Sequence, residues 1–165
     1  KDYLGKAGTT IFVATLIIWA LLNFGPGGYS TDMSKSFGAI IGKLLVPFFE
    51  PIGLGFWQID VALIAGISAK EVVVSSCAVL FGKVNASSPE GMFSFARELQ
   101  AIGFTQFNAF CLMVFCLLYI PCAATLSTIR KESNSWSWMC FAAFFQLAVA
   151  WLVTFAVYQI GAMIL

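Results

Sequence analysis

Two ionisable residues, Lys70 and Glu71, stand side by side within the apolar stretch from Asp60 to Cys77. A charged side chain at the centre of a bilayer costs roughly 2.5–3.5 kcal/mol, whereas each Leu, Ile or Val gains only about 0.3–0.6 kcal/mol. The apolar residues of this segment therefore gain too little insertion free energy to let the charged pair face lipid. We expect Lys70 and Glu71 to face protein or a water-filled path and to serve transport or gating. The alternative is that Lys70 pairs with a carboxylate on a neighbouring helix and only fixes packing.

The same stretch carries other polar residues at helical spacing. Positions eleven residues apart differ by about 20° around a helix, so Asp60 and Glu71 share a face if the helix is continuous. Ser68 and Ser75 flank Glu71 at three and four residues and extend this polar stripe. Such a stripe is typical of residues that line a transport path. The assignment is weaker for Asp60, because Asp60 lies near the expected membrane interface, where a polar residue needs no functional reason. Gly66 favours an interruption, as in transporters whose broken helices bind ions.

A proline and a cysteine form a second candidate site in a later apolar stretch. Pro121 has no amide proton for the carbonyl of Leu117, and its ring opens that turn. At membrane depth the freed carbonyl needs a partner, such as a hydroxyl, a water or a cation. Cys122 offers beside it a soft ligand for a borderline transition metal. Buried cysteines are more often small packing residues, which is the alternative for Cys122 and the expectation for the other four cysteines.

The composition is that of an integral membrane protein. Of the 165 residues, 60% are hydrophobic and 10% are charged, whereas soluble domains average about 25% charged residues. A net charge of +1 provides no basic face for a nucleic acid. The absence of histidine removes the commonest metal ligand, so a metal site must use cysteine, carboxylate, methionine or backbone carbonyl groups. Because the sequence has neither a P-loop nor a histidine-containing triad, we expect no enzyme active site in it.

Four apolar segments approach the roughly 20 residues that span a bilayer. They cover about 7–24, 57–81, 107–128 and 138–165. The stretch of about 37–49 is too short to span and predicts a short amphipathic helix that is re-entrant or interfacial. The link 82–106 is expected to be an aqueous loop with a polar, weakly helical stretch at Phe93–Leu99. The expected fold is all-α, a polytopic transmembrane helix bundle with broken helices. The chain also starts without a methionine and stops inside an apolar run, so we expect it to be a piece of a longer protein.

Several motifs in a fixed order resemble one family. They are Ile64-Ala-Gly-Ile-Ser-Ala-Lys-Glu-Val-Val-Val, Leu117-Leu-Tyr-Ile-Pro-Cys-Ala-Ala-Thr, and Arg130-Lys-Glu with a tryptophan soon after. Together they resemble the C-terminal membrane region of bacterial ferrous iron transport protein B (FeoB), with its second Gate motif of nucleoside-transporter-like type. Two further runs look similar, Lys6-Ala-Gly-Thr-Thr-Ile and Val46-Pro-Phe-Phe-Glu-Pro-Ile-Gly, so the resemblance spans nearly the whole chain.

The resemblance implies a multi-pass protein of the bacterial inner membrane that takes up Fe²⁺ as its transported ion. Residues 1–165 would supply the second Gate, while the first Gate and a GTPase domain would lie upstream and only that domain would bind GTP. Cys122 matches the Gate cysteine that is proposed to handle the metal, and Lys70 and Glu71 match the intramembrane charged pair. The expected partners are the lipid bilayer and the remainder of the transporter. A homo-oligomer is left open, and no nucleic acid is expected.

The site expectations follow from both arguments. Cys122 and Glu71 would contact the metal, and the transport path or gate would involve five further residues: Asp60, Ser68, Lys70, Ser75 and Pro121. A rival hypothesis is a Gate-type carrier of a nucleoside or other small organic solute, in which Glu71 and the serines hydrogen-bond the substrate while Cys122 merely packs. A third is a membrane scaffold that transports nothing. A GTPase P-loop in the upstream sequence would favour iron.

Overall fold

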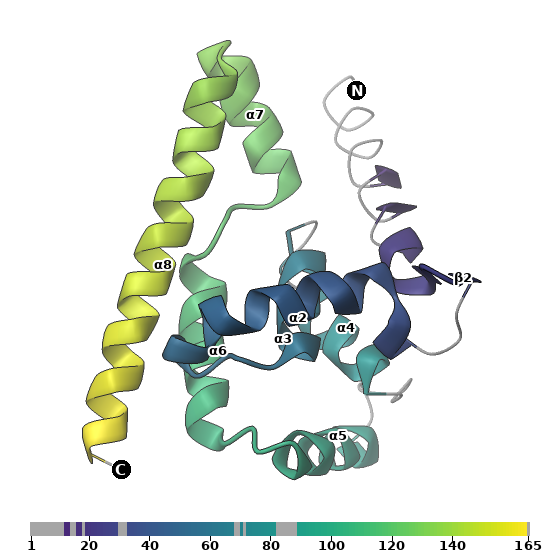
Figure 1. Cartoon of the computed structure of the whole chain (residues 1–165). Helices are drawn as coiled ribbons and strands as arrows, with labels where there is room; N and C mark the ends of the chain where they lie inside the picture. Colours follow the sequence, from purple (N-terminus) through teal and green to yellow (C-terminus); the bar gives the residue numbers. More distant parts are fainter. Residues whose placement is uncertain are drawn as a thin grey trace.

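The computed structural model describes residues 12–13, 16–17, 19–29, 33–67, 70, 72–81 and 89–164. These residues are almost entirely helical (Figure 1). The α-helices are α2 (Phe37–Phe49), α3 (Trp57–Ala65), α4 (Val72–Leu80), α5 (Pro89–Ala101), α6 (Gln106–Leu118), α7 (Ala123–Ser133) and α8 (Trp136–Ile164). A two-stranded hairpin, β1 (Phe24–Gly25) and β2 (Gly28–Tyr29), and the short 3₁₀-helices η1 (Met33–Lys35) and η2 (Glu50–Ile52) complete them. The all-α prediction is confirmed.

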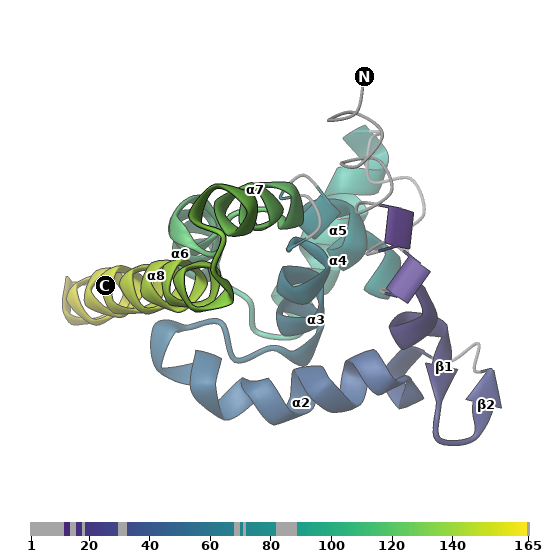
Figure 2. The ribbon, with the colours of Figure 1, turned by 90° about the horizontal axis from the view of Figure 1, so that it is seen from above.

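The long helix α8 forms one side of the molecule. Helices α6 and α7 pack against it, and α3 and α4 lie on the far side of α6 (Figures 1 and 2). The C-terminal end of α2 reaches α8, where Trp151 Nε1 donates to the Phe48 carbonyl at 3.0 Å. The buried core lies between these groups and includes Ile52, Ile59 and Phe115. The Phe49 ring meets the Phe115 ring edge to face at 5.4 Å, which joins the end of α2 to α6. The core thus holds the α2–α4 region against the α6–α8 region.

The described residues contain one helix that is long and apolar enough to cross a membrane, Trp136–Met163 of α8. Two pairs of consecutive helices, each bent sharply at a short break, would raise the number of membrane spans to three if each pair counts as one span. They are Phe37–Ile52 with Trp57–Ala65, bent by 102°, and Glu90–Ala101 with Gln106–Leu118, bent by 105°. Large apolar side chains of α8 such as Phe144 and Met163 are exposed, which is the pattern of a helix surface in contact with lipid.

Two of the expected long segments are divided in the structure, which corrects their bounds. The segment predicted at 57–81 consists of α3 and α4, and α3 ends with Gly66 as its C-cap. The segment predicted at 107–128 consists of α6 and α7, and α7 continues to Ser133. Pro121 accounts for the second break, because a proline disfavours helical backbone in the residue before it and donates no hydrogen bond. The continuous helix on which Asp60 was expected to share a face with Glu71 is thus interrupted after Ala65, and Glu71 lies outside the described residues.

The link expected to be an aqueous loop contains a regular helix, α5. The Phe95 ring of α5 lies 5.8 Å from the Phe81 ring, and Leu99 packs against the core. The face of α5 that carries Phe95 and Leu99 is therefore the buried one. Helix α5 contains the predicted weakly helical stretch Phe93–Leu99 and is longer than that stretch at both ends, with the apolar spacing of an amphipathic helix. Residues 12–13, 16–17 and 19–23 of the first expected segment are helical, and the rest of that segment lies outside the described residues.

Helix α2 has the bounds expected for the short helix and lies very close to α3. It begins after Ser36, whose hydroxyl accepts a hydrogen bond from the Ala39 amide at 3.1 Å. A Cβ atom at Gly42 would lie 2.6 Å from Val61 Cγ2 and 2.7 Å from the carbonyl oxygen of Trp57. The crossing of α2 and α3 therefore requires a residue without a side chain at position 42.

Gly42→Ala should lower the free energy of unfolding by about 1–3 kcal/mol, the range for overpacking a close contact. The Trp57 carbonyl belongs to a helix backbone and cannot rotate away as a side chain can. The measurement is reversible unfolding of the detergent-solubilised protein. Gly27→Ala is the matched control, because a Cβ at Gly27 meets nothing within 4 Å. Equal stability of the two variants would contradict the close crossing.

Candidate functional site

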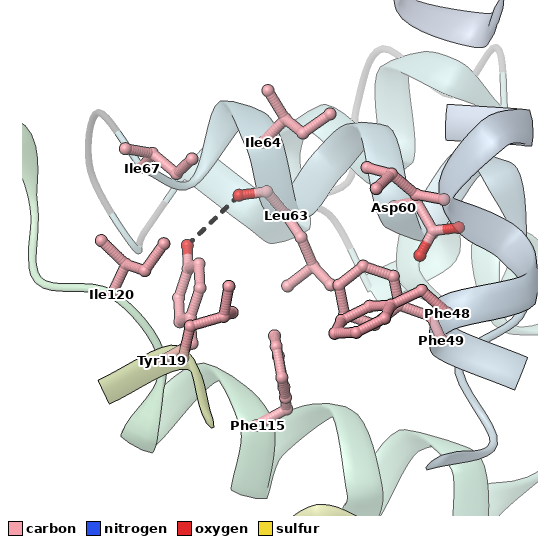
Figure 3. A pocket seen from close by; sticks show the side chains of 11 residues that line it. Phe48, Phe49, Asp60, Leu63, Ile64, Ile67, Phe115, Tyr119 and Ile120 are labelled. Atoms are coloured by element: carbon pink, nitrogen blue, oxygen red, sulfur yellow. Dashed lines mark hydrogen bonds between the residues drawn. The ribbon is translucent and has the colours of Figure 1, made fainter. Parts of the chain in front are cut away.

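The break between α3 and α4 lies against the break between α6 and α7. The amide of Ala123, the first residue of α7, donates to the carbonyl of Ile67, just beyond α3, at 2.9 Å. The Tyr119 hydroxyl donates to the Leu63 carbonyl at 3.4 Å (Figure 3). Two segments that are more than fifty residues apart in the chain are thus joined through backbone groups.

These backbone groups are available because each helix has stopped. In a continuous helix the Leu63 carbonyl would accept from the Ile67 amide, four residues later. The Ile67 amide donates instead to the Ile64 carbonyl at 3.2 Å, in the tighter 3₁₀ pattern. The Tyr119 hydroxyl therefore replaces a donor that the end of α3 has lost.

Lys70 satisfies the carbonyl that Pro121 cannot serve. Its Nζ lies 3.3 Å from the Leu117 carbonyl oxygen and 3.4 Å from that of Tyr119. The Leu117 carbonyl lacks its helical donor because residue 121 is proline. The Tyr119 carbonyl lacks its donor because the Ala123 amide is turned to Ile67. The sequence predicted that the freed carbonyl needs a partner, and the partner is a cationic side chain of the protein itself.

The ring of Tyr119 lies at the centre of this crossing. Lys70 Nζ is 5.3 Å from its centroid, within the range of a cation–π interaction. The ring also stacks on Phe115 at 5.5 Å, which fixes it to α6. A Cβ at Gly66 would collide with the Tyr119 hydroxyl and with Val73 Cγ2. Glycine at position 66 is therefore what allows the two breaks to approach each other.

Cys122 lies at the break as the N-cap residue of α7. Its side chain is half-buried, and its Sγ is 3.3 Å from the Thr125 hydroxyl. Among the described residues, no three His, Cys, Asp or Glu side chains are placed to hold a metal ion together. A metal at Cys122 would thus need ligands of another kind, such as carbonyl groups or water, or a carboxylate such as Glu71, which the structure does not describe.

Two more cysteines lie in or against the core cluster that contains Tyr119. Cys116 directly precedes Leu117, whose carbonyl oxygen is 3.3 Å from Lys70 Nζ. Cys77 lies on α4 and is buried. The sequence predicts packing roles for both, because neither stands next to a helix-breaking residue. Their place in the core depends on tertiary packing, which the spacing does not reveal.

Asp60 is fully buried, and neither of its carboxyl oxygens has a hydrogen-bond partner among the described residues. It lines a cavity of about 160 Å³ that extends to Tyr119 and Ile120 at the break (Figure 3). The other lining residues are Leu45, Phe48, Phe49, Leu63, Ile64, Ile67, Phe115 and Leu147. The side chain lies in the core between α2, α3 and α6, and its position relative to the membrane interface stays a prediction.

The structure brings together only part of the predicted site. Lys70, Pro121 and Cys122 meet at the crossing, and Asp60 lies at the other end of the cavity. Ser68 and Glu71 lie outside the described residues, and Ser75 belongs to α4 but its side chain is not described. The sequence analysis missed Tyr119, although its place two residues before Pro121 was a usable signal.

Comparison with known families places this arrangement of broken helices in a class. A family model named Gate, described as nucleoside recognition, matches residues 4–136. The chain therefore belongs to the Gate family.

Individual relatives narrow the class. The chain is 38% identical over 161 residues to the Fe(2+) transporter FeoB of Staphylococcus aureus strain MSSA476, and 37% identical over 168 residues to that of Methanocaldococcus jannaschii. The FeoB of Synechocystis sp. PCC 6803 is 29% identical over 159 residues. These matches cover 96–98% of the chain but only 23–24% of each relative, so the chain spans about a quarter of their length. The predicted resemblance is confirmed, and no solved structure matches the chain.

Tyr119→Phe should lower the free energy of unfolding by about 1 kcal/mol, because it leaves the buried Leu63 carbonyl without a donor. The matched control is Tyr158→Phe. Within the described residues the Tyr158 hydroxyl makes no hydrogen bond, while its ring stacks on Phe107 as the Tyr119 ring stacks on Phe115. Reversible unfolding in detergent measures both variants. A loss for Tyr158→Phe as large as that for Tyr119→Phe would refute a bracing role for the Tyr119 hydroxyl.

Proposed function

We propose that this chain forms the membrane-embedded part of a transporter for ferrous iron, within a multi-pass protein of the bacterial inner membrane. The observation that carries the proposal is the similarity, along 98% of the chain, to a protein named Fe(2+) transporter FeoB. The remainder of the transporter, with a first Gate and a GTPase domain, is the proposed partner. Any GTP would bind to that domain, and this chain would perform no enzymatic reaction.

Cys122 is the proposed metal contact, with Glu71 supplying negative charge. The thiol lies at a helix break, where backbone groups turn away from the helical pattern and become available as ligands. Thiolate and carboxylate ligands suit a borderline divalent metal. A transport site must also release its ion, so a low number of protein ligands at Cys122 agrees with transient binding.

Asp60, Ser68, Lys70, Ser75 and Pro121 are the proposed residues of the path and its gate. Pro121 creates the break, and the Lys70 ammonium group holds it against the α3–α4 break. The apolar cavity between α2, α3 and α6 reaches from Asp60 to Tyr119 at the break, which places a buried carboxyl group near the proposed path. A buried polar group without a partner is unfavourable for folding, which supports a functional reason for keeping Asp60.

The cavity gives less support to an organic solute. A nucleoside presents several donors and acceptors, and its sites carry matching polar groups. Among the residues that line the cavity only Asp60 and Tyr119 have polar side-chain atoms, and the Tyr119 hydroxyl is engaged with Leu63. The cavity therefore offers a nucleoside no matching polar groups.

Cys122→Ser should reduce uptake of radioactive Fe²⁺ at least severalfold in cells whose only iron transporter is the full-length protein. A hydroxyl is a poorer ligand than a thiolate for this metal. Cys140→Ser is the matched control, because Cys140 is exposed on α8. Immunoblots of the membrane fraction should give equal protein levels. Normal uptake by Cys122→Ser would contradict the proposed metal contact.

Asp60→Leu should change stability and transport in opposite directions. Removing an unpartnered buried carboxyl from an apolar cavity should raise the melting temperature of the protein in detergent. Loss of the carboxyl from the path should lower iron uptake. An uptake rate equal to that of the unmodified protein would exclude Asp60 from the path, whatever its effect on stability.

A further inference from the structure

Two basic residues and two tryptophans lie where α7 turns into α8, and the proposed function gives them no role. Arg130 and Lys131 belong to the last turn of α7, while Trp136 and Trp138 belong to the first turn of α8. Among the described residues, α8 is the one helix long and apolar enough to cross a membrane by itself, and this turn lies at its N-terminal end (Figure 1). The turn is therefore expected at the depth of the lipid headgroups, where tryptophan is enriched.

Arg130 is held against an aromatic ring with its hydrogen-bond donors free. Its Cζ atom lies 3.6 Å from the centroid of the Trp136 ring, which is the separation of a stacked pair. Stacking occupies the face of the guanidinium group, whereas its N–H donors point outward in the plane of the group. Within the described part of the chain, neither the Arg130 guanidinium group nor the Lys131 ammonium group has a hydrogen-bond or ion-pair partner. Both side chains are exposed, so their donors are available to a ligand.

The charge at this turn is positive on the side of Arg130. Successive residues of an α-helix are about 100° apart, so Lys131 lies on an adjacent face of α7 and Glu132 lies about 200° away from Arg130. Glu132 is the one acidic residue of α7, and the first turn of α8 contains none. An anion at Arg130 would therefore be attracted by Lys131 as well, while the nearest acidic side chain of these helices points to the other side.

We infer that the turn between α7 and α8 binds the headgroup of an anionic phospholipid. The N–H edge of Arg130 donates to the phosphate oxygens, for which the planar guanidinium group has a matching geometry, and Lys131 adds a second positive charge. Phe141 and Phe144 expose their rings on α8 within about two turns of Trp136, so the apolar surface that acyl chains would cover begins at the same level. At this depth phosphate groups are the anions that surround a helix, which favours a lipid over an acidic segment of another protein.

Such a lipid would hold one end of α7. The helix begins after its N-cap residue Cys122, at the break, and ends at the turn that carries Arg130. A headgroup bound there would fix the depth of this end of α7 in the bilayer, so the helix that follows the break would be anchored at its far end. The inference does not depend on which ion or solute is transported.

Chemical modification of arginine tests the inference on the unmodified full-length protein. The protein is reconstituted in nanodiscs of phosphatidylcholine, with or without phosphatidylglycerol, and treated with phenylglyoxal. Mass spectrometry then quantifies the modification of each arginine. Phosphatidylglycerol should slow the modification of Arg130 at least severalfold more than that of Arg97. The latter is the matched control, because it is exposed on α5 and stacks on no ring among the residues that the structure covers.

The stacking partner of Arg130 provides a second test. Trp136→Leu removes the ring that orients the guanidinium group and should abolish most of the protection by phosphatidylglycerol. Trp138→Leu should leave the protection in place, because the Trp138 ring contacts Phe141 instead. Equal protection of Arg130 and Arg97, or protection that survives Trp136→Leu, would overturn the inference. So would protection of Arg130 by inorganic phosphate as strong as that by phosphatidylglycerol, because the turn would then bind free anions. The first measurement needs no variant, so it decides the matter if Trp136→Leu does not fold.

Discussion

A backbone carbonyl without a donor is unfavourable at membrane depth, and this constraint governs the arrangement of the chain. Each helix break releases such groups. In this chain the two breaks lie against each other and supply the missing donors. Lys70 and the Tyr119 hydroxyl donate to carbonyls of the opposite break, and the Ala123 amide donates to the Ile67 carbonyl. Neither break is satisfied by its own helix. The close approach at Gly66 and the stacking of Tyr119 on Phe115 then follow as requirements of this pairing.

The same pairing connects structure with the proposed transport. The crossing combines hydrogen bonds of 2.9–3.4 Å with the core packing of Leu63, Val73 and Tyr119. Cys122 lies at this crossing, and the cavity from Asp60 reaches it. An ion bound at Cys122 would therefore be next to both helix breaks.

The sequence predicted the parts of this arrangement that depend on local chemistry. The bounds of α2, the interruption at Gly66 and the unmet carbonyl before Pro121 all follow from residue types and short spacings. The sequence did not predict the partner, because Lys70 and Leu117 are 47 residues apart and only the tertiary fold joins them. The burial of Asp60 also depends on the tertiary fold, because α2 and α6 cover that face of α3.

The most direct test of the central claim is a double-mutant cycle between Lys70→Met and Pro121→Ala, measured as the free energy of unfolding in detergent. Alanine at position 121 supplies the amide that the Leu117 carbonyl lacks, so Lys70 is no longer needed there. The account predicts that Lys70→Met destabilises the protein less with alanine at position 121 than with proline, because only the Tyr119 carbonyl then still depends on Lys70. The coupling between the two changes should be about 0.5–3 kcal/mol. Additive effects would show that Lys70 does not compensate for the proline break, and would contradict the account.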